Sequence, residues 1–461
     1  MAGLMPKPLW IFQVFANFQH VIRGFIVFAT VLRFLSLAWV ALASGPDPDA
    51  PRFLEGDLRK IDFDVSGFHI YWKDRLRLES PEKALKIQIG GIVQVDSGYI
   101  GANSPLQGDF PGLQGYNTDF RRLRLTTFTT LYETVDIKLD IDFARQQEIK
   151  DFWIGMSNLP VVGDVRVGHM KEPFSLEELT SSTNLTFMEK SLPILAMSPG
   201  RDVGALCQNT ALNNRLTWSA GAFVVTGSFA NMGNAGDRLS HIQGYAFTGR
   251  ITGLPWYADK GLRLMHTGLS YTYQDRNATN MDSRLKLSTL PESYLTYQRL
   301  VSTPSFLNNG MHMIDQEWAV VLGPLSFQAE YVHAFVNADK ADDPGFWGGY
   351  VYGSYFLTGE HRTYDMKKGF FGRVKPKDNF RFFGVGLGAW ELALRYSYVD
   401  LNSGKIQGGK ERNLTAGVNW YINPHIRIML NYIHADVRDR AAPPVDHGNA
   451  DIYQGRFQIN F

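Results

Sequence analysis

Hydrophobic and polar residues alternate along many segments of the chain, each about ten residues long. In the segment DIKLDIDF (136–143), apolar residues occupy every second position and charged residues fill the positions between them. The segments 392–398, 413–420 and 426–432 repeat this pattern. A period of two is that of an extended strand, whose successive side chains point to opposite faces of a sheet. The pattern therefore predicts an all-β fold.

The strand ends and connections favour a transmembrane barrel over a soluble β-sandwich, which also alternates. Several predicted strands end in large aromatic residues, as the two interfacial girdles of a membrane barrel require: Trp153, Trp218, Trp420 and Tyr432. Turn signals alternate with longer connections rich in Gly and Asp. The turns are Asn213-Asn214 and Asn423-Pro424, and the long connections are 227–240, 275–310 and 338–348. Short turns on one rim and long loops on the other are typical of outer-membrane barrels.

The number of predicted strands indicates a water-filled channel. Roughly sixteen alternating segments lie between Leu85 and Phe461, and an antiparallel barrel of that size leaves an aqueous lumen. After residue 45 there is no apolar stretch long enough for a membrane helix. The last segment, YQGRFQINF (453–461), alternates and ends on Phe461. We interpret it as the terminal strand that the barrel-assembly machinery recognises.

The amino terminus reads as a secretory signal. Arg23 and Arg33 supply positive charge, an apolar run follows at 34–43, and Ala41-Leu42-Ala43 is a small-residue cleavage site. The rival interpretation is an anchoring helix over 21–40, which the two arginines interrupt. We therefore predict a signal peptide at 1–43, a periplasmic lead-in at 44–84 with a strand near 63–72, and a barrel at 85–461.

Charge and cysteine content exclude several classes of protein. The 46 Lys and Arg residues balance 45 Asp and Glu residues, so the formal net charge is +1 and no nucleic-acid partner is indicated. The single cysteine, Cys207, cannot form an intramolecular disulfide or a zinc cluster, and we expect it to be buried or to face the lumen. No cofactor or metal site is predicted. Calcium binding by Asp339, Asp342 and Asp343 is a weaker alternative, because their spacing is irregular.

Five segments carry a family resemblance: FRRLRL (120–125), KEPFSLEELTSSTNLTFMEKSLP (171–193), SPGRDVG (198–204), GAWELALRYSYVDLN (388–402) and TAGVNWYINPHIRIMLNYIHAD (415–436). They resemble the phosphate-selective porin O and P family of Gram-negative outer membranes, from about Ala84 to Phe461. The resemblance implies a homotrimer of 16-stranded barrels that passes phosphate or other small anions. It also implies that the third loop folds into the pore and forms a constriction.

Residues 171–201 are the predicted constriction loop. Ser175-x-x-Glu178 is a capping box and predicts a short helix. By resemblance, Ser181, Ser182 and Lys190 contact the solute, and Asp151 is an acidic residue of the constriction. Arg201 either takes part in permeation or ties the loop to the barrel wall.

The alternation of side chains along a strand predicts which face each arginine of 120–125 occupies. Arg122 and Arg124 share a face opposite Leu123 and Leu125, so we expect both to face the lumen as solute-contacting residues. Arg121 has the parity of the lipid face, which places it at the rim or in a subunit contact.

Two departures from the family pattern keep a non-selective porin open as an alternative. Ile92 follows Gly90-Gly91 where family members tend to carry Arg, and Lys190 stands where Arg is common. Glu177 and Glu178 add negative charge near the serines.

The chain is therefore predicted to be a passive outer-membrane porin and not an enzyme. A barrel hydrolase that uses His266, His333 or His434, or a structural barrel with a blocked pore, would be the competing functions.

Overall fold

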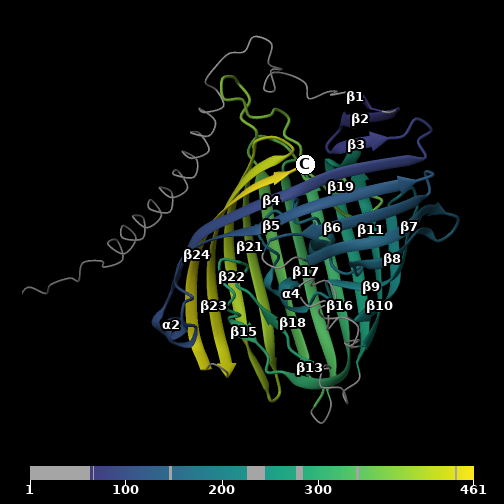
Figure 1. The fold of residues 1–461 in the computed structure, drawn as a ribbon. Helices are drawn as coiled ribbons and strands as arrows, with labels where there is room; N and C mark the ends of the chain where they lie inside the picture. Colours follow the sequence, from purple (N-terminus) through teal and green to yellow (C-terminus); the bar gives the residue numbers. More distant parts are fainter. Residues whose placement is uncertain are drawn as a thin grey trace, which may run out of the picture.

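Within the described residues, sixteen antiparallel strands close into one barrel (Figure 1). The barrel is closed where β24 pairs with β4, for example Tyr453 with Tyr99. This confirms the predicted fold class. The strands are β4 (Leu85–Ala102), β5 (Gly115–Leu131), β6 (Val135–Asp142), β7 (Glu148–Leu159), β8 (Gly163–Lys171), β9 (Arg201–Ala211), β10 (Leu216–Val225), β11 (Gly244–Ala258), β12 (Arg263–Arg276), β16 (Phe306–Leu322), β17 (Leu325–Ala338), β18 (Gly345–Phe356), β21 (Ala389–Ser403), β22 (Ile406–Tyr421), β23 (Ile426–Ala441) and β24 (Pro444–Asn460).

This computed structural model describes residues 63–65, 67–144, 148–225, 244–276, 284–338, 342–441 and 444–461. The predicted signal peptide lies outside the described residues. No helix in the described ranges has the length and apolar character that a helical membrane span requires.

The described part of the lead-in forms a small sheet that continues into the barrel. Strands β1 (Phe63–Val65), β2 (Phe68–Trp72) and β3 (Leu76–Glu79) pair in order, and β3 pairs with the start of β4. The segment 63–72, predicted as one strand, is therefore two short strands. Nearby, the backbone of Phe461 exchanges two hydrogen bonds with Gly91, at 2.8 and 3.0 Å. A Cβ at Gly91 would lie 2.8 Å from the Phe461 ring, so this close approach requires glycine.

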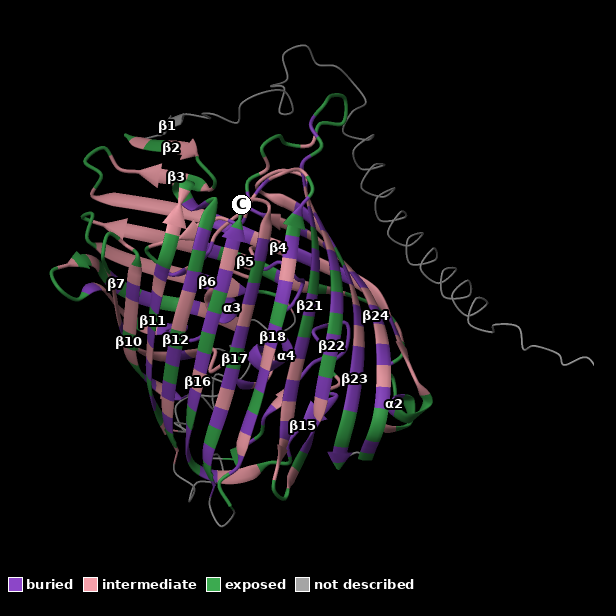
Figure 2. Cartoon of the chain, turned by 180° about the vertical axis from the view of Figure 1, so that it is seen from behind, coloured by how far each residue is buried: buried purple, intermediate pink, exposed green. Residues whose placement is uncertain are grey.

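Burial alternates along the barrel strands, as the sequence pattern predicts (Figure 2). On β21, Glu391 and Arg395 are buried in the lumen, whereas Leu392 and Leu394 are exposed on the outer wall. Cys207 corrects one expectation. It is half-buried and sits between Leu206 and Gln208, which line the inner cavity, so strand parity puts the thiol on the outer wall.

The two rims of the barrel differ in their connections. On one rim, called here the short-turn rim, strands are joined at 132–134, 160–162, 212–215, 259–262, 323–324 and 422–425. The turn at 259–262 contains η2 (Asp259–Gly261). The opposite rim carries longer connections, including 103–114 with α2 (Ser104–Asp109), although the connections 404–405 and 442–443 there are short. The predicted asymmetry is confirmed with one large exception, because the 32-residue segment 357–388 lies on the short-turn rim.

Three segments fold into the lumen. The constriction loop, 172–200, contains α3 (Leu176–Leu179) and α4 (Leu192–Met197). The described part of the connection between β12 and β16, 284–305, contains β13 (Arg284–Leu285), β14 (Ser288–Thr289) and β15 (Val301–Ser302). The third, 357–388, called here the rim segment, enters from the short-turn rim with β19 (Tyr364–Asp365) and β20 (Phe370–Phe371). Only the constriction loop was predicted to fold inward, and its inward course is confirmed.

These segments build an apolar core inside the barrel. The largest cluster of buried apolar residues joins the constriction loop and the segment 284–305 to the inner faces of β16, β17, β18, β21, β23 and β24. The lumen-facing positions of β16 and β17 include Met311, Met313, Val332 and Val336. The alternation along the strands predicts polar side chains on the lumen face. On this side of the barrel that prediction is wrong, because the inward segments exclude water from the face.

Replacing Phe187 tests whether the apolar core stabilises the constriction loop in the lumen. Its ring is buried, packs edge-on against Tyr352 at 5.4 Å and lies under the Arg395 guanidinium at 4.4 Å. Phe187→Ala should lower the free energy of unfolding by about 3–5 kcal/mol, because it leaves a cavity in a packed interior. Denaturant titration in detergent micelles measures this change. The control is Phe247→Ala on the exposed outer wall, and equal losses for the two variants would contradict a packed lumen.

Candidate functional site

A cavity of about 470 Å³ lies between the constriction loop and the inner wall formed by β4 to β11. It is on the opposite side of the lumen from the apolar core. All seven residues predicted for the solute path line it, and the structure therefore brings them together: Arg122, Arg124, Asp151, Ser181, Ser182, Lys190 and Arg201.

The constriction loop begins with the predicted helix. The Ser175 Oγ accepts a hydrogen bond from the Glu178 backbone N–H at 3.0 Å and caps α3. The return half of the capping box is absent here, because the Glu178 side chain is turned toward Lys171 and Lys190. The Ser175 N–H instead donates to the Ser270 Oγ on the barrel wall at 3.3 Å.

A carboxylate of the barrel wall binds the amino-terminal end of α3. Glu330 of β17 accepts hydrogen bonds from the Ser175 hydroxyl at 2.6 Å and from the N–H groups of Leu176 and Glu177 at 2.9 and 2.8 Å. Tyr350 donates a further hydrogen bond to the same carboxylate. These contacts satisfy backbone donors that a helix leaves unpaired at its start. They fix where the loop enters the lumen.

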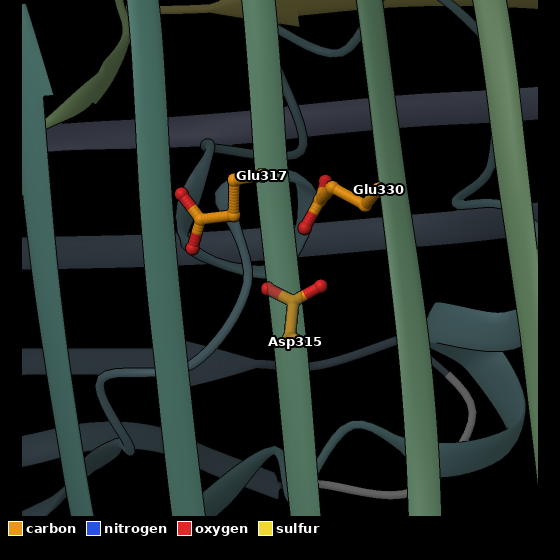
Figure 3. A group of neighbouring side chains, drawn as sticks. All are labelled: Asp315, Glu317 and Glu330. Carbon is orange, nitrogen blue, oxygen red and sulfur yellow. The ribbon is translucent and has the colours of Figure 1, made fainter.

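Glu330 lies beside two other buried carboxylates, Asp315 and Glu317 of β16 (Figure 3). Their oxygens lie within 4.8 Å of one another, the spacing of a cation site. Glu317, however, already accepts two hydrogen bonds from Arg250 at 2.7 Å, one from His266 at 3.0 Å and one from Ser270 at 3.0 Å. Donors occupy the acceptor positions of Glu317 and Glu330, so these two carboxylates hold Arg250 and the loop, whereas both oxygens of Asp315 are buried without a hydrogen-bond partner among the described residues.

Glu189 ties the far half of the loop to the opposite wall. Its carboxylate bonds to Arg121 at 2.8 Å and to Arg456 at 2.5 Å, and Arg122 lies 3.5 Å away. Arg456 also binds Asp96 through two bonds of 2.6 and 2.7 Å. Burial alone would raise the pKa of Glu189, but the three guanidinium groups outweigh it and hold that pKa well below its usual range. The loop therefore stays charged and anchored at neutral pH.

Arg121 faces the lumen, which corrects the prediction from strand parity. Gln94 pairs with Arg122 and the next residue, Val95, pairs with Phe120, so Arg121 is the extra residue of a β-bulge. The bulge shifts the alternation by one position and turns Arg121 inward to Glu189 and over the Tyr294 ring. Arg122 and Arg124 face the lumen as predicted.

Ion pairs position the basic groups along the cavity wall. Arg124 binds Asp142 at 2.8 Å, and Arg122 donates to Gln94 at 2.6 Å. Asp151 lies between two cations, with Lys138 at 2.5 Å and Arg201 at 2.9 Å. Arg201 therefore both lines the cavity and ties the start of β9 to the wall.

Glu178 is the counter-ion of two lysines in the constriction loop region. Its carboxylate contacts the Lys190 ammonium and lies 3.4 Å from that of Lys171. Burial would raise the pKa of Glu178, but the two ammonium groups lower it to about 2. In the sequence this glutamate only adds negative charge near the serines; in the structure it neutralises part of the charge of Lys171 and Lys190.

The structure adds seven basic residues to the lining: Arg75, Lys138, Arg166, Lys171, Arg250, Lys368 and Arg373. The alternation of side chains along β6, β8 and β11 could have predicted that Lys138, Arg166 and Arg250 face the lumen. Arg75 comes from the hairpin between β2 and β3, and Lys368 and Arg373 come from the rim segment. No feature of the sequence indicates that Arg75, Lys368 and Arg373 reach the cavity. Ile92 also lines the cavity, so the departure from the family pattern falls inside the site.

The model of one protein family matches most of the chain. It is the family "Phosphate-selective porin O and P", matched over residues 93–461. Porin O of Pseudomonas aeruginosa is 24% identical over 404 residues, which cover 79% of this chain and 86% of that protein. An uncharacterized protein of Caulobacter vibrioides is 27% identical over 407 residues, which cover 85% of this chain and 77% of that protein.

Solved structures of outer-membrane channels align with most of the chain. An anion-selective porin from Comamonas acidovorans aligns with a TM-score of 0.49 and 12% identity, covering 82% of this chain and 100% of that chain. The outer-membrane channel DcaP of Acinetobacter baumannii aligns with a TM-score of 0.47 and 10% identity, covering 83% and 99%. On the match over 93–461, the chain belongs to the phosphate-selective porin O and P family, and it is a porin of the outer membrane.

Proposed function

We propose that this porin is a passive channel that prefers small anions such as phosphate, and that it has no enzymatic activity. The observation that carries the proposal is the excess of basic side chains in the cavity lining. Eleven Lys and Arg residues line it, against the three carboxylates Asp140, Asp151 and Asp365. The carboxylates that pair with them from behind the lining, such as Asp142, Glu178, Glu189 and Glu317, do not remove the excess.

The proposed solute contacts follow from this chemistry. Arg122, Arg124 and Lys190 supply positive charge, and the hydroxyls of Ser181 and Ser182 replace water around a partly dehydrated anion. In a narrow, partly desolvated ring each charge counts for more than it does on a wet surface. The negative charge of Asp151 opposes anion binding, and the ion pairs of Asp151 with Lys138 and Arg201 offset that charge.

The alternatives find less support. The three histidines considered for a hydrolase are separated: His266 is bonded to Glu317 and Tyr364, His333 stacks on Phe335 and His434 binds Asp451. In the Asp-rich connection, Asp339 lies outside the described residues, and Asp343 accepts a hydrogen bond from the Ala338 N–H at 3.1 Å. A non-selective porin remains the alternative, and measurements of ion selectivity decide between the two.

Two variants should shift selectivity in opposite directions. Lys190→Ala removes a positive charge from the constriction and should lower the anion-to-cation permeability ratio. Glu178→Gln removes the carboxylate that pairs with Lys190 and Lys171 and should raise the ratio. A unit charge at about 8 Å in an effective dielectric of about 40 contributes about 1 kcal/mol, or roughly fivefold in this ratio. Reversal potentials of single channels in asymmetric salt measure both changes.

The same experiment has an internal check in its pH dependence. Because the pKa of Glu178 is lowered to about 2, the carboxylate stays ionised at pH 4 and loses its charge only as the pH falls through about 2. Acidification from pH 7 to pH 4 should therefore not reproduce the effect of Glu178→Gln. Shifts of the same sign for the two variants would mean that they act by loosening the loop, and would contradict the charge model.

Ile92 offers a gain-of-function test. It lines the cavity and pairs with Arg124 across β4 and β5. Ile92→Arg adds a charge where the family tends to carry one, and it should raise anion preference and strengthen the block of chloride current by phosphate. Ile92→Leu is the matched control and should change neither quantity. Chloride conductance titrated with phosphate measures the block, and an unchanged block in Ile92→Arg would count against the site.

We infer further that the porin is a homotrimer whose subunits meet through the outer wall of β24, β4 and β5. This wall carries small and polar residues midway along the strands, including Gly455, Ser97 and Thr118, and the two hydroxyls of Ser97 and Thr118 bond at 2.8 Å. Large apolar residues flank this small and polar patch on β5, including Phe120 and Leu123, and they cover the rest of the outer wall, for example Phe247, Trp318 and Val351. Small and polar residues facing outward are unfavourable toward lipid but permit close packing of protein surfaces.

A bulky side chain on this wall should break the trimer. Ser97→Trp places an indole in the proposed contact and should convert trimers to monomers in detergent, as mass photometry or sedimentation would show. Ala329→Trp, on the outer wall of β17, is the control and should leave the trimer intact. A Ser97→Trp protein of unchanged mass would refute this placement of the interface.

Export and assembly complete the proposal. The signal peptide 1–43 would direct the chain across the inner membrane, and the assembly machinery would recognise β24 through Phe461. The position of Phe461 supports this role, because its backbone pairs with Gly91 where the last strand meets the first strand of the barrel.

A further inference from the structure

The outer part of the rim segment exposes an unusual set of apolar side chains. Phe382, Phe383, Val385 and Leu387 are 82%, 92%, 97% and 65% exposed, and they form what we call the apolar tip. A soluble surface seldom presents four large apolar groups together, and such a patch normally marks a contact with another molecule or a membrane.

The base of the tip is attached to two tryptophans. The Leu387 carbonyl oxygen accepts hydrogen bonds from the indole N–H groups of Trp390 at 3.2 Å and Trp420 at 3.0 Å. The two indoles stack with their centroids 5.2 Å apart, and the Phe380 ring packs edge-on against Trp420 at 4.9 Å. The tip is therefore held beside this pair of rings.

The tryptophan pair faces the membrane side of the barrel. Trp390 pairs with Trp420 across β21 and β22. Trp390 also alternates with the lumen-facing residues Ala389 and Glu391, and it shares the outward face with the exposed Leu392 and Leu394. Both tryptophans lie at the short-turn rim, which in an outer-membrane barrel is the periplasmic rim. Tryptophans in this position form the interfacial aromatic girdle.

Basic residues flank the tip. Lys375, Lys377 and Arg381 are exposed, and Asp378 is the one acidic residue between 375 and 388. Apolar and aromatic residues combined with nearby cations are the composition of a segment that lies in a phospholipid interface, with the rings among the acyl chains and the cations at the phosphates.

We propose that the apolar tip inserts into the periplasmic leaflet of the outer membrane and anchors the rim segment to phospholipid. Continuity with the lipid-facing tryptophans favours lipid over a periplasmic protein as the occupant, and the cationic flank complements phospholipid headgroups. The same segment carries Lys368 and Arg373 into the cavity lining. The anchor thus joins the membrane surface to the periplasmic end of the pore.

Site-specific fluorescence tests the insertion. A bimane label on Val385→Cys, in the full chain with Cys207→Ser, is reconstituted into vesicles of phosphatidylethanolamine and phosphatidylglycerol. Spin-labelled lipid should quench this label several-fold more than a label on Asn213→Cys, which sits in a short turn of the same rim. Iodide in the buffer should quench the two labels in the reverse order. Strong quenching of the Val385 label by iodide, or shielding from both quenchers by a subunit or protein partner, overturns the proposal.

A second variant separates anchoring from folding. Phe382→Ser combined with Phe383→Ser should abolish the lipid quenching at position 385, while single-channel conductance is retained because neither ring lines the cavity. Retention of the lipid quenching in this double variant would also overturn the proposal, since the two rings would then contribute nothing to insertion.

Discussion

Buried hydrogen bonds between the barrel wall and the backbone of the constriction loop are the interaction on which the rest of the structure depends. A loop inside a barrel leaves its N–H and C=O groups away from bulk water, where each unpaired group costs about 1–3 kcal/mol. Glu330 binds the N–H groups at the start of α3. Arg427 and Arg456 donate to the carbonyl oxygens of residues 185, 186 and 188. The wall thereby stabilises an irregular segment in the lumen.

This attachment divides the lumen into two unequal environments. On the side of β16 to β24 the inward segments pack into an apolar core, and the barrel there resembles the interior of a globular protein. On the side of β4 to β11 a cavity remains, lined mostly by basic groups. Many lumen carboxylates are engaged in holding arginines or loop backbone, as Glu189, Glu317 and Glu330 show. The cavity lining nevertheless keeps more basic than acidic side chains, because these carboxylates neutralise only some of its arginines.

Much of the site was predictable because it depends on local rules. Alternation placed Arg122 and Arg124 in the lumen, and the capping box located α3. The same rule failed at Arg121, where one extra residue in β5 reversed the parity. Arg75, Lys368 and Arg373 could not be predicted, because they reach the cavity from the lead-in and from the opposite rim. Their positions depend on tertiary contacts such as the bond from Arg250 to the Gly369 carbonyl oxygen.

The sequence by itself determined the barrel, its approximate strand number, the inward course of 171–201 and the family, because strand periodicity, caps and motifs act between residues close along the chain. Only the tertiary structure decided which half of the lumen is filled, that a second long connection and the rim segment fold inward, and which basic groups meet at the cavity. Those outcomes depend on packing and charge pairing between residues far apart in sequence, such as Glu189 with Arg456 and Glu292 with Arg395, and no local pattern encodes them.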